Sequence, residues 1–266
     1  MAMTRRRFLA TTGALGVAGC ARTKELIGKG DDGAFSVATV GDTHVLDLRS
    51  TSIVQRAVSR INADERVVLT VAVGDMATDG KLQELTLTKR AFDRLGGEFY
   101  AIPGNHDVDM TSQDIYGNYR KVFGEADWRT NYGDWTFIGL DSCEGAAPDV
   151  SIRPDRIEWL QKQLDHVKPG RPIGLFTHHP FNPNTKAYRV QNADETLALF
   201  ADHNLKFVAS GHFHGNQVEE RDGVLFTTTA CCSSTRGNHD GTEARGFRLF
   251  HIDGESIETE FVEVPL

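Results

Sequence analysis

The sequence predicts an α/β fold with one main domain, and three observations indicate it. Short apolar runs rich in β-branched and aromatic residues recur along the chain, and their length is typical of buried strands. Several stretches between these runs repeat apolar residues at helical spacing, and alternating strands and helices build layered α/β domains. No linker, internal repeat or change of composition divides residues 34–266, so we expect a single domain there.

The apolar runs are the expected strands. In chain order they are Phe35–Val40, Val67–Val73, Phe99–Ile102, Trp135–Leu140, Ile173–Thr177 and Leu205–Ala209. Because most positions in these runs are apolar, rather than every second one, we expect strands that are covered on both faces.

Amphipathic stretches between the runs are the expected helices. The first has one apolar face, formed by Ile53, Val54, Ala57, Val58 and Ile61. The second has a face formed by Ile157, Leu160, Leu164 and Val167, with Pro154 near its start and Pro169-Gly170 just past its end. The third carries Leu197 and Phe200 and begins at Asn192 or Asp194.

The last third of the chain predicts two β-hairpins. Gln217–Arg221 and Val224–Ala230 flank Asp222-Gly223, a pair of residues typical of a two-residue turn. Phe247–Ile252 and Ser256–Val264 flank Asp253-Gly254 in the same way.

The composition excludes several classes of protein. Hydrophobic residues make up 39% and charged residues 25% of the 266 positions, which is an ordinary globular balance. No apolar run approaches the roughly 18–20 residues of a membrane-spanning helix, so a multispan membrane protein is excluded. The net charge of −8 argues against a protein that coats nucleic acid. Four cysteines are too few for a disulfide scaffold.

The N-terminus predicts an export signal in residues 1–19. Basic Arg5, Arg6 and Arg7 precede a short uncharged segment, and their order resembles the twin-arginine export motif. Residues 17–20, Val-Ala-Gly-Cys, resemble a lipobox, in which Cys20 becomes the lipidated N-terminus and anchors the protein to a membrane surface. We therefore expect a lipid-anchored protein in the periplasm or on the outer face of the membrane. Residues 20–33 then read as a flexible tether.

Polar clusters follow five of the expected strands. They are Gly41-Asp42-Thr43-His44, Gly74-Asp75, Gly104-Asn105-His106-Asp107, His178-His179-Pro180 and Gly211-His212-Phe213-His214. Loops at the carboxyl ends of strands in α/β sheets converge on one crevice, so these side chains should meet. Carboxylate, imidazole and amide oxygen without thiolate suit a borderline divalent metal such as Mn, Fe or Zn. A single histidine is usually structural, but this ordered series predicts a metal site.

The ordered series resembles the calcineurin-like metallophosphoesterase superfamily, in its bacterial phosphodiesterase branch, over residues 36–214. The resemblance implies a four-layer α/β/β/α sandwich of two mixed sheets that binds two divalent metal ions. It implies Asp42, His44 and His214 at one metal, Asp75 bridging, and Asn105, His178 and His212 at the other. It also implies that His106 binds no metal and serves as the catalytic general acid.

The resemblance implies an enzyme that hydrolyses phosphate esters by in-line attack of a metal-bound hydroxide. Phosphodiesters such as cyclic nucleotides or glycerophosphodiesters are the favoured substrates. A phosphomonoesterase or nucleotide pyrophosphatase on the same site is the alternative, and a non-catalytic metal- or ligand-binding lipoprotein is a further one. We expect no nucleic-acid partner, because removal of residues 1–19 leaves 26 basic and 37 acidic residues, a net charge of −11. No obligate protein partner is evident.

Several points stay open in the sequence. His178 lies two before Pro180, as the family pattern requires of a ligand, so His179 is expected to line the pocket. Asp109 or Asp79 could orient His106. A second Gly-Asn-His-Asp, residues 237–240, follows no expected strand and is interpreted as a loop, with contact to the substrate as the alternative. Cys143, Cys231 and Cys232 are expected to be buried thiols, with a bond from Cys143 as the alternative. Substrate specificity is expected to reside in loops 108–120, 183–191 and 233–245.

Overall fold

The computed structural model describes residues 25–26, 33–185 and 187–266. Its strands are β1 (Glu25–Leu26), β2 (Phe35–Val40), β3 (Val67–Val73), β4 (Glu98–Ile102), β5 (Trp128–Tyr132), β6 (Trp135–Gly139), β7 (Pro172–Thr177), β8 (Asn204–Ser210), β9 (Gln217–Arg221), β10 (Val224–Thr228), β11 (Gly246–Asp253) and β12 (Ser256–Glu263). Its helices are α1 (Thr51–Ile61), α2 (Leu82–Phe92), α3 (Gly117–Phe123), α4 (Pro154–Leu164) and α5 (Ala193–Ala198). The expected strands and helices are therefore present, with ends that differ by a few residues.

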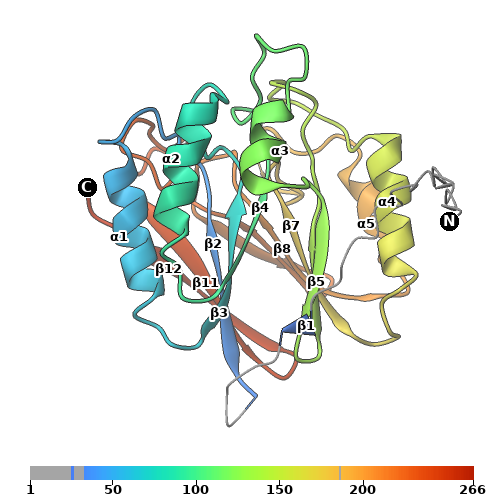
Figure 1. Ribbon diagram of the computed structural model, residues 1–266. Coiled ribbons are helices and arrows are strands. Elements are labelled where there is room, and N and C mark those ends of the chain that lie inside the picture. Colours follow the sequence, from blue (N-terminus) through green and yellow to red (C-terminus); the bar gives the residue numbers. More distant parts are fainter. Residues whose placement is uncertain (1–24, 27–32, 186) are drawn as a thin grey trace, which may run out of the picture.

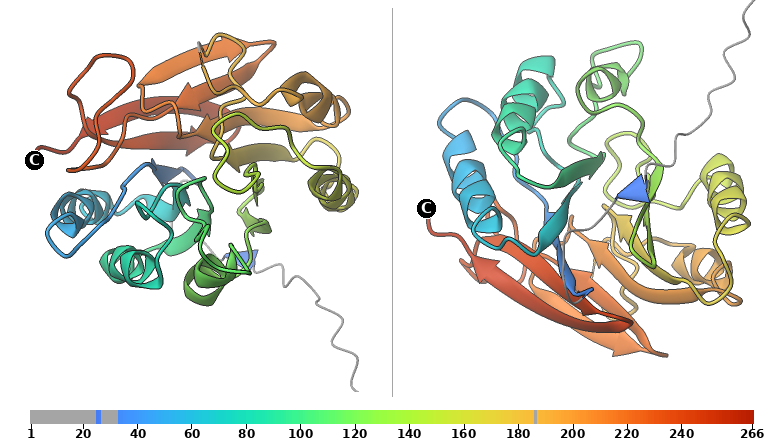
Figure 2. Two further views of the ribbon diagram at one scale, coloured as in Figure 1. Left: turned by 90° about the horizontal axis from the view of Figure 1, so that it is seen from above. Right: turned by 60° about the horizontal axis from the view of Figure 1, so that its bottom comes forward.

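These elements form four layers, as the fold class predicted. Among the described residues, one mixed sheet has the order β1-β5-β6-β7-β8-β10-β9 and the other the order β12-β11-β2-β3-β4. In Figure 1, α1 and α2 lie on one outer side of the two sheets, and α4 and α5 lie on the other. Figure 2 shows from further directions how the C-terminal strands, in red, complete one sheet. The arrangement is an α/β/β/α sandwich.

Apolar side chains fill all three spaces between the layers. In β2, Val37 packs in the core between the sheets, whereas Ala38 and Val40 pack in the core under α1 and α2, so both faces are covered. Phe207 of β8 stacks on Phe250 of β11, with ring centroids 4.5 Å apart, and joins the two sheets directly. Burial on both faces explains why β2 reads as a continuous apolar run instead of an alternating one.

The predicted helices bury the faces that the sequence indicated. The buried residues of α1 include Ile53, Val54, Ala57, Val58 and Ile61. Pro154 is the first residue of α4, where the missing amide hydrogen of proline costs no helical hydrogen bond. Asn192, rather than Asp194, directly precedes α5. The helix ends at Ala198, so Phe200 packs from the following turn.

Four elements were not expected from the sequence: α2, α3, β5 and the two-residue β1, which lies inside the predicted tether and pairs with β5. The buried face of α2 includes Glu84 and Thr88, which weakens the apolar pattern. Glu84 accepts a hydrogen bond from the Asp79 backbone, and the Thr88 hydroxyl donates to the Met76 carbonyl, so both polar groups have partners. Both partners lie in the loop just before α2, but periodicity counts polar residues as exposed and does not show which of them are buried with a hydrogen-bond partner.

Both C-terminal hairpins are present. Arg221 pairs with Val224, so Asp222 and Gly223 form a two-residue turn, and both have the positive φ that such turns require. In the second hairpin Asp253 pairs with Ser256, which places the turn at Gly254-Glu255, one residue later than predicted.

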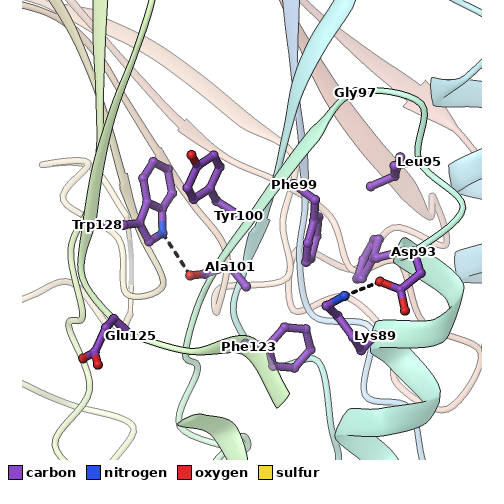
Figure 3. Close-up of a pocket in the computed structure, with 11 residues that line it drawn as sticks. Lys89, Asp93, Leu95, Gly97, Phe99, Tyr100, Ala101, Phe123, Glu125 and Trp128 are labelled. Atoms are coloured by element: carbon purple, nitrogen blue, oxygen red, sulfur yellow. Dashed lines mark hydrogen bonds and ion pairs between the residues drawn. The ribbon is translucent and has the colours of Figure 1, made fainter. Parts of the chain in front are cut away.

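Other features lie away from the strand ends where the motifs are found. A cleft of about 490 Å³ between α2, β4 and β5 is lined by Phe92, Phe99 and Trp128 among others, and none of the predicted site residues contributes to it (Figure 3).

Within the described ranges, no helix has the length and apolar character needed to span a membrane. The predicted export signal and Cys20 lie outside the described residues, as does most of the predicted tether.

Candidate metal centre

The predicted ligands lie in loops that directly follow strands of both sheets. Asp42 and His44 follow β2, Asp75 follows β3, and Asn105 and His106 follow β4. His178 follows β7, and His212 and His214 follow β8 in the other sheet. Because β2, β3 and β4 are mutually parallel, as are β7 and β8, each group of loops emerges at one sheet edge. The structure brings the two edges together.

Five of the seven predicted ligands have a backbone that L-residues rarely adopt. The φ angles of Asp42, His44, Asp75, His212 and His214 lie between 42° and 62°. Each such residue costs on the order of 1–3 kcal/mol and persists only where the surroundings fix it. Here the loops fix one another: the His44 amide donates to the Asp75 carbonyl at 2.9 Å, and the His212 amide donates to Asp42 Oδ1 at 3.0 Å. Strain is thus concentrated at the predicted ligands.

One cluster of buried donor atoms is formed by Asp42, His44, Asp75 and His214. His214 Nε2 lies 3.2 Å from Asp42 Oδ1 and 3.2 Å from His44 Nε2. His44 Nε2 lies 3.5 Å from Asp75 Oδ2. Two carboxylates and two imidazoles therefore converge on one point.

A second cluster lies on the other side of Asp75. Asp75 Oδ1 is 3.3 Å from His178 Nε2, which is itself 3.3 Å from Asn105 Oδ1 and 3.1 Å from His212 Nδ1. The two oxygens of one buried carboxylate consequently face two different clusters. This cluster also brings His179 close to His178 and His212.

The imidazole tautomers show that a cation fits between these residues. His178 Nδ1 faces the Val73 carbonyl at 2.8 Å, His212 Nε2 the Pro148 carbonyl at 3.0 Å, and His214 Nδ1 the Gly237 carbonyl at 3.0 Å. A carbonyl only accepts hydrogen bonds, so each of these nitrogens carries the hydrogen, and the opposite nitrogen of a neutral ring presents its lone pair inward. Lone pairs directed at one another at such distances need a positive charge between them, and this second hydrogen bond is typical of metal-binding histidines.

The electrostatics of the clusters agree with this interpretation. Burial lowers the pKa of His44 to about 4 and that of His212 to about 4, so both rings are neutral at pH 7. Burial alone would raise the pKa of Asp75, but the neighbouring His178 outweighs it and holds the pKa well below the usual range. Although burial opposes it, the neighbouring carboxylates raise the pKa of His178 to about 9 and also raise that of His214, so a proton on each of these two rings stands in for a cation in the metal-free chain. A metal that binds there would displace these protons, because a histidine ligand must be neutral.

Comparison with known proteins identifies the family. A family model described as calcineurin-like phosphoesterase matches residues 35–216. The chain belongs to this family. It is a metal-dependent phosphoesterase of the hydrolase class, and its two clusters are compatible with a dinuclear metal site.

Relatives of the phosphoesterase agree with this assignment. It is 29% identical over 237 residues to a "Probable cyclic nucleotide phosphodiesterase" of Synechococcus sp., and the aligned region covers 84% of this chain and 90% of the relative. It is 31% identical over 177 residues to a "Probable glycerophosphodiester phosphodiesterase" of Arcobacter nitrofigilis, and the aligned region covers 61% of this chain and 62% of the relative. The structure of a purple acid phosphatase from yellow lupin shares the fold, with a TM-score of 0.66 at 11% identity over 86% of this chain and 51% of that one.

His106 of the phosphoesterase lies beside the clusters. Its ring centroid is 4.9 Å from that of His44, and its backbone amide donates to Asp75 Oδ1 at 2.9 Å. Its Nδ1 faces the Thr78 carbonyl at 2.8 Å. In the described contacts neither Asp109 nor Asp79 touches His106, because Asp109 binds Thr111 and Asn118, and Asp79 pairs with Lys81. A backbone carbonyl, rather than a carboxylate, therefore orients this ring.

Asp107 is a residue whose role the sequence analysis missed, although it stands in the same motif. It is buried, with Oδ1 accepting from the Ala77 amide at 2.8 Å and Oδ2 from the Gly104 amide at 2.9 Å. Burial, assisted by the charge of Asp75, raises its pKa to about 7. Asp107 thus ties the loop after β4 to the loop after β3, and the two loops carry Asn105, His106 and Asp75.

A cavity of about 450 Å³ opens over the clusters. Besides predicted site residues, it is lined by Pro148, Tyr188, Arg236, Gly237, Asn238 and His239. Residues 237–240 form a loop, as expected, and the geometry supports the alternative that this loop reaches the site, because it supplies the carbonyl for His214 and one wall of the cavity. Two of the three expected specificity loops contribute to the lining, through Tyr188 and through residues 236–239, whereas loop 108–120 does not.

Two smaller expectations are also settled. His179 does not line this cavity: it is buried, with its ring centroid 4.3 Å from that of His212 and Nδ1 2.9 Å from the Ser142 hydroxyl. Cys143, Cys231 and Cys232 are free and buried, as expected.

Proposed function

We propose that this phosphoesterase hydrolyses phosphodiesters with two divalent ions, of Mn, Fe or Zn, bound per chain. The observation that carries the proposal is the position of Asp75, whose two oxygens face the two clusters at 3.5 Å from His44 and 3.3 Å from His178. A carboxylate shared in this way is the ligand that a two-metal phosphoesterase site requires. The names of the relatives from Synechococcus and Arcobacter support diesters as the substrate class.

Each cluster is assigned one metal in this proposal. Asp42, His44 and His214 hold the first with one oxygen of Asp75, and Asn105, His178 and His212 hold the second with the other oxygen. Two divalent ions held by these residues would supply positive charge that stabilises the phosphoryl oxygens and makes a water molecule a better nucleophile. The Val73, Pro148 and Gly237 carbonyls fix the ring orientations of His178, His212 and His214 beforehand.

His106 is proposed to donate a proton to the leaving oxygen of the ester. The Thr78 carbonyl accepts the Nδ1 hydrogen and so favours a ring that can carry a second hydrogen on Nε2. The ring lines the cavity without being needed by either cluster, which places it where a departing alkoxide can be protonated.

The test combines metal analysis with a panel of substrates. The purified wild-type protein, reconstituted with Mn²⁺, should hold two metals per chain and hydrolyse bis-nitrophenyl phosphate and cyclic AMP faster than nitrophenyl phosphate. Asp75→Asn should lose metal and turnover while its circular dichroism is unchanged. Asp79→Asn removes a nearby carboxylate that pairs only with Lys81 among the described contacts, so it should behave as wild type.

Other results would point elsewhere. One metal per chain under replete conditions would refute the two-metal site. Faster hydrolysis of monoesters would favour a phosphomonoesterase, and two bound metals without hydrolysis of any ester would favour a binding protein.

We also propose that the protein is exported by the twin-arginine route and anchored through Cys20. The support is the sequence of residues 1–20 alone. Replacing Arg5 and Arg6 together by lysine should retain precursor in the cytoplasm, and Cys20→Ser should abolish membrane fractionation. Unchanged export or unchanged fractionation would contradict the corresponding half of the proposal.

A further inference from the structure

The loop after β6, residues 142–148, approaches the second cluster from the sheet that does not carry Asn105. Its Ala146 carbonyl accepts a hydrogen bond from Asn105 Nδ2 at 3.4 Å, and its Pro148 carbonyl accepts one from His212 Nε2 at 3.0 Å. In each side chain the bonded nitrogen is the one that points away from His178, so Asn105 Oδ1 and His212 Nδ1 are left facing His178. The loop therefore decides which atom of each side chain faces the cluster. Without the Ala146 carbonyl, the amide of Asn105 could turn its NH₂ group inward, and an NH₂ group cannot bind a metal.

This loop depends on bonds made at the Cys143 carbonyl. Arg153 Nη1 donates to that carbonyl at 2.5 Å, and the Tyr116 hydroxyl donates to it at 3.3 Å. Tyr116 also accepts from the Gly145 amide at 3.3 Å, so it holds the loop at two points. Arg153 lies immediately before α4 and is further held by the buried Asp141 at 3.7 Å. These contacts connect a helix start to the two carbonyls that face the ligands.

We propose that Arg153 is a positioning residue for the second metal and that it acts through the loop of residues 142–148. This inference rests on the proposed metal sites. It assigns to Arg153 no contact with metal or substrate: the guanidinium fixes the Cys143 carbonyl, and the loop in turn fixes the metal-facing atoms of Asn105 and His212. The first cluster makes no contact with this loop among the described hydrogen bonds, so only the second metal should respond to a change at Arg153.

The experiment measures Mn²⁺ binding to the metal-free protein by calorimetry, with elemental analysis of the same samples. Arg153→Met keeps the length of the stem but removes the donor. It should weaken the second metal by about tenfold, the lower end of what outer-shell changes cost, and leave the first metal unchanged. Arg153→Lys retains one donor and should recover part of the affinity. The kcat of Arg153→Met at saturating Mn²⁺ should return to the wild-type value, because the loss is in metal affinity and not in chemistry.

Arg156→Met is the matched control. Arg156 lies one turn further along α4 and also pairs with Asp141, at 3.4 Å, and with Asp127, but it has no described contact with the loop. It should bind both metals as wild type does. If Arg153→Met does not fold, Tyr116→Phe removes a single hydroxyl from the same carbonyl and should weaken the same metal to a smaller extent.

The outcomes separate this inference from the proposed function. Fewer than two metals on the wild-type protein would overturn the proposed function. Two metals on the wild type, with unchanged affinity in Arg153→Met or Tyr116→Phe, would overturn the positioning role alone. Equal weakening of both metals, or equal weakening in Arg156→Met, would show a general structural effect and would also overturn it.

Discussion

Removal of the His106 ring should separate proton transfer from metal binding. The contact that ties His106 to Asp75 is made by its backbone amide, at 2.9 Å, and is retained in His106→Ala. The lost ring contacts are those with Thr78 and His44, and neither is needed to complete a cluster. We therefore expect both metals to stay bound. General acid catalysis contributes about 10²–10⁴-fold, so the barrier should rise by about 3–5 kcal/mol for a substrate with a poor leaving group.

The assay compares leaving groups. Nitrophenolate needs little protonation, so hydrolysis of bis-nitrophenyl phosphate should fall least in His106→Ala. A ribose alkoxide needs a proton, so hydrolysis of a cyclic nucleotide should fall furthest. The measurement is kcat across esters whose leaving groups rise in pKa, with metal content determined on the same samples. Asp109→Asn serves as a control and should keep the wild-type pattern.

Two results would refute this reasoning. Equal losses across the series with both metals present would mean that His106 stabilises charge on the phosphoryl group and does not donate a proton. Loss of metal would mean that the imidazole itself belongs to the metal site, contrary to the geometry around Asn105.

Two further predictions follow from packing and burial. A Cβ on Gly104 would lie 2.1 Å from Asp75 Oδ1, so Gly104→Ala should displace that carboxylate. Metal analysis should then show weaker binding at both sites. Full metal content would contradict the proposed sharing of Asp75. Burial raises the pKa of Asp127 to about 6, above its ordinary value of 3.8, so folding favours its protonated form. The free energy of unfolding of wild type relative to Asp127→Asn should rise by on the order of 2 kcal/mol as the pH falls from 7 to 4. A constant difference over that range, measured by urea titration, would contradict this.

The concentration of backbone strain at the predicted ligands has a structural reason. Asp42 and His44 are two residues apart, as are His212 and His214, and in an extended strand both members of each pair would point to the same side in a line. The positive φ angles bring Asp42 and His44 together in the first cluster, and they let His214 join that cluster while His212 faces the second. The sequence contained this information only as spacing, since glycine, the residue that most easily adopts such angles, stands beside these positions and not at them.

Sequence by itself determined the α/β class, most of the strands and helices, and the inventory of donor groups. Strand length, apolar periodicity and the polar residues after each strand are local properties, so Phe35–Val40 and the motifs at Asp42, Asp75 and Asn105 could be recognised from near neighbours. The four-layer architecture, which the resemblance of these motifs to the family implied, and the family itself were both confirmed. Helix α2 was missed because its buried face includes polar groups, and only the folded chain shows that these groups have hydrogen-bond partners.

Only the tertiary structure decided how the donors are shared and held. The two oxygens of Asp75 reach His44 and His178, which are 31 residues before and 103 residues after it in the chain. The carbonyls that orient His214 and His212 come from Gly237 and Pro148, and no side-chain pattern shows which backbone carbonyl will take this role. The partner of His106 is the Thr78 carbonyl, and every residue has a carbonyl, so side-chain chemistry could not identify it. Contacts of this kind depend on how two sheets pack and which loops they bring together, and that is a property of the whole fold.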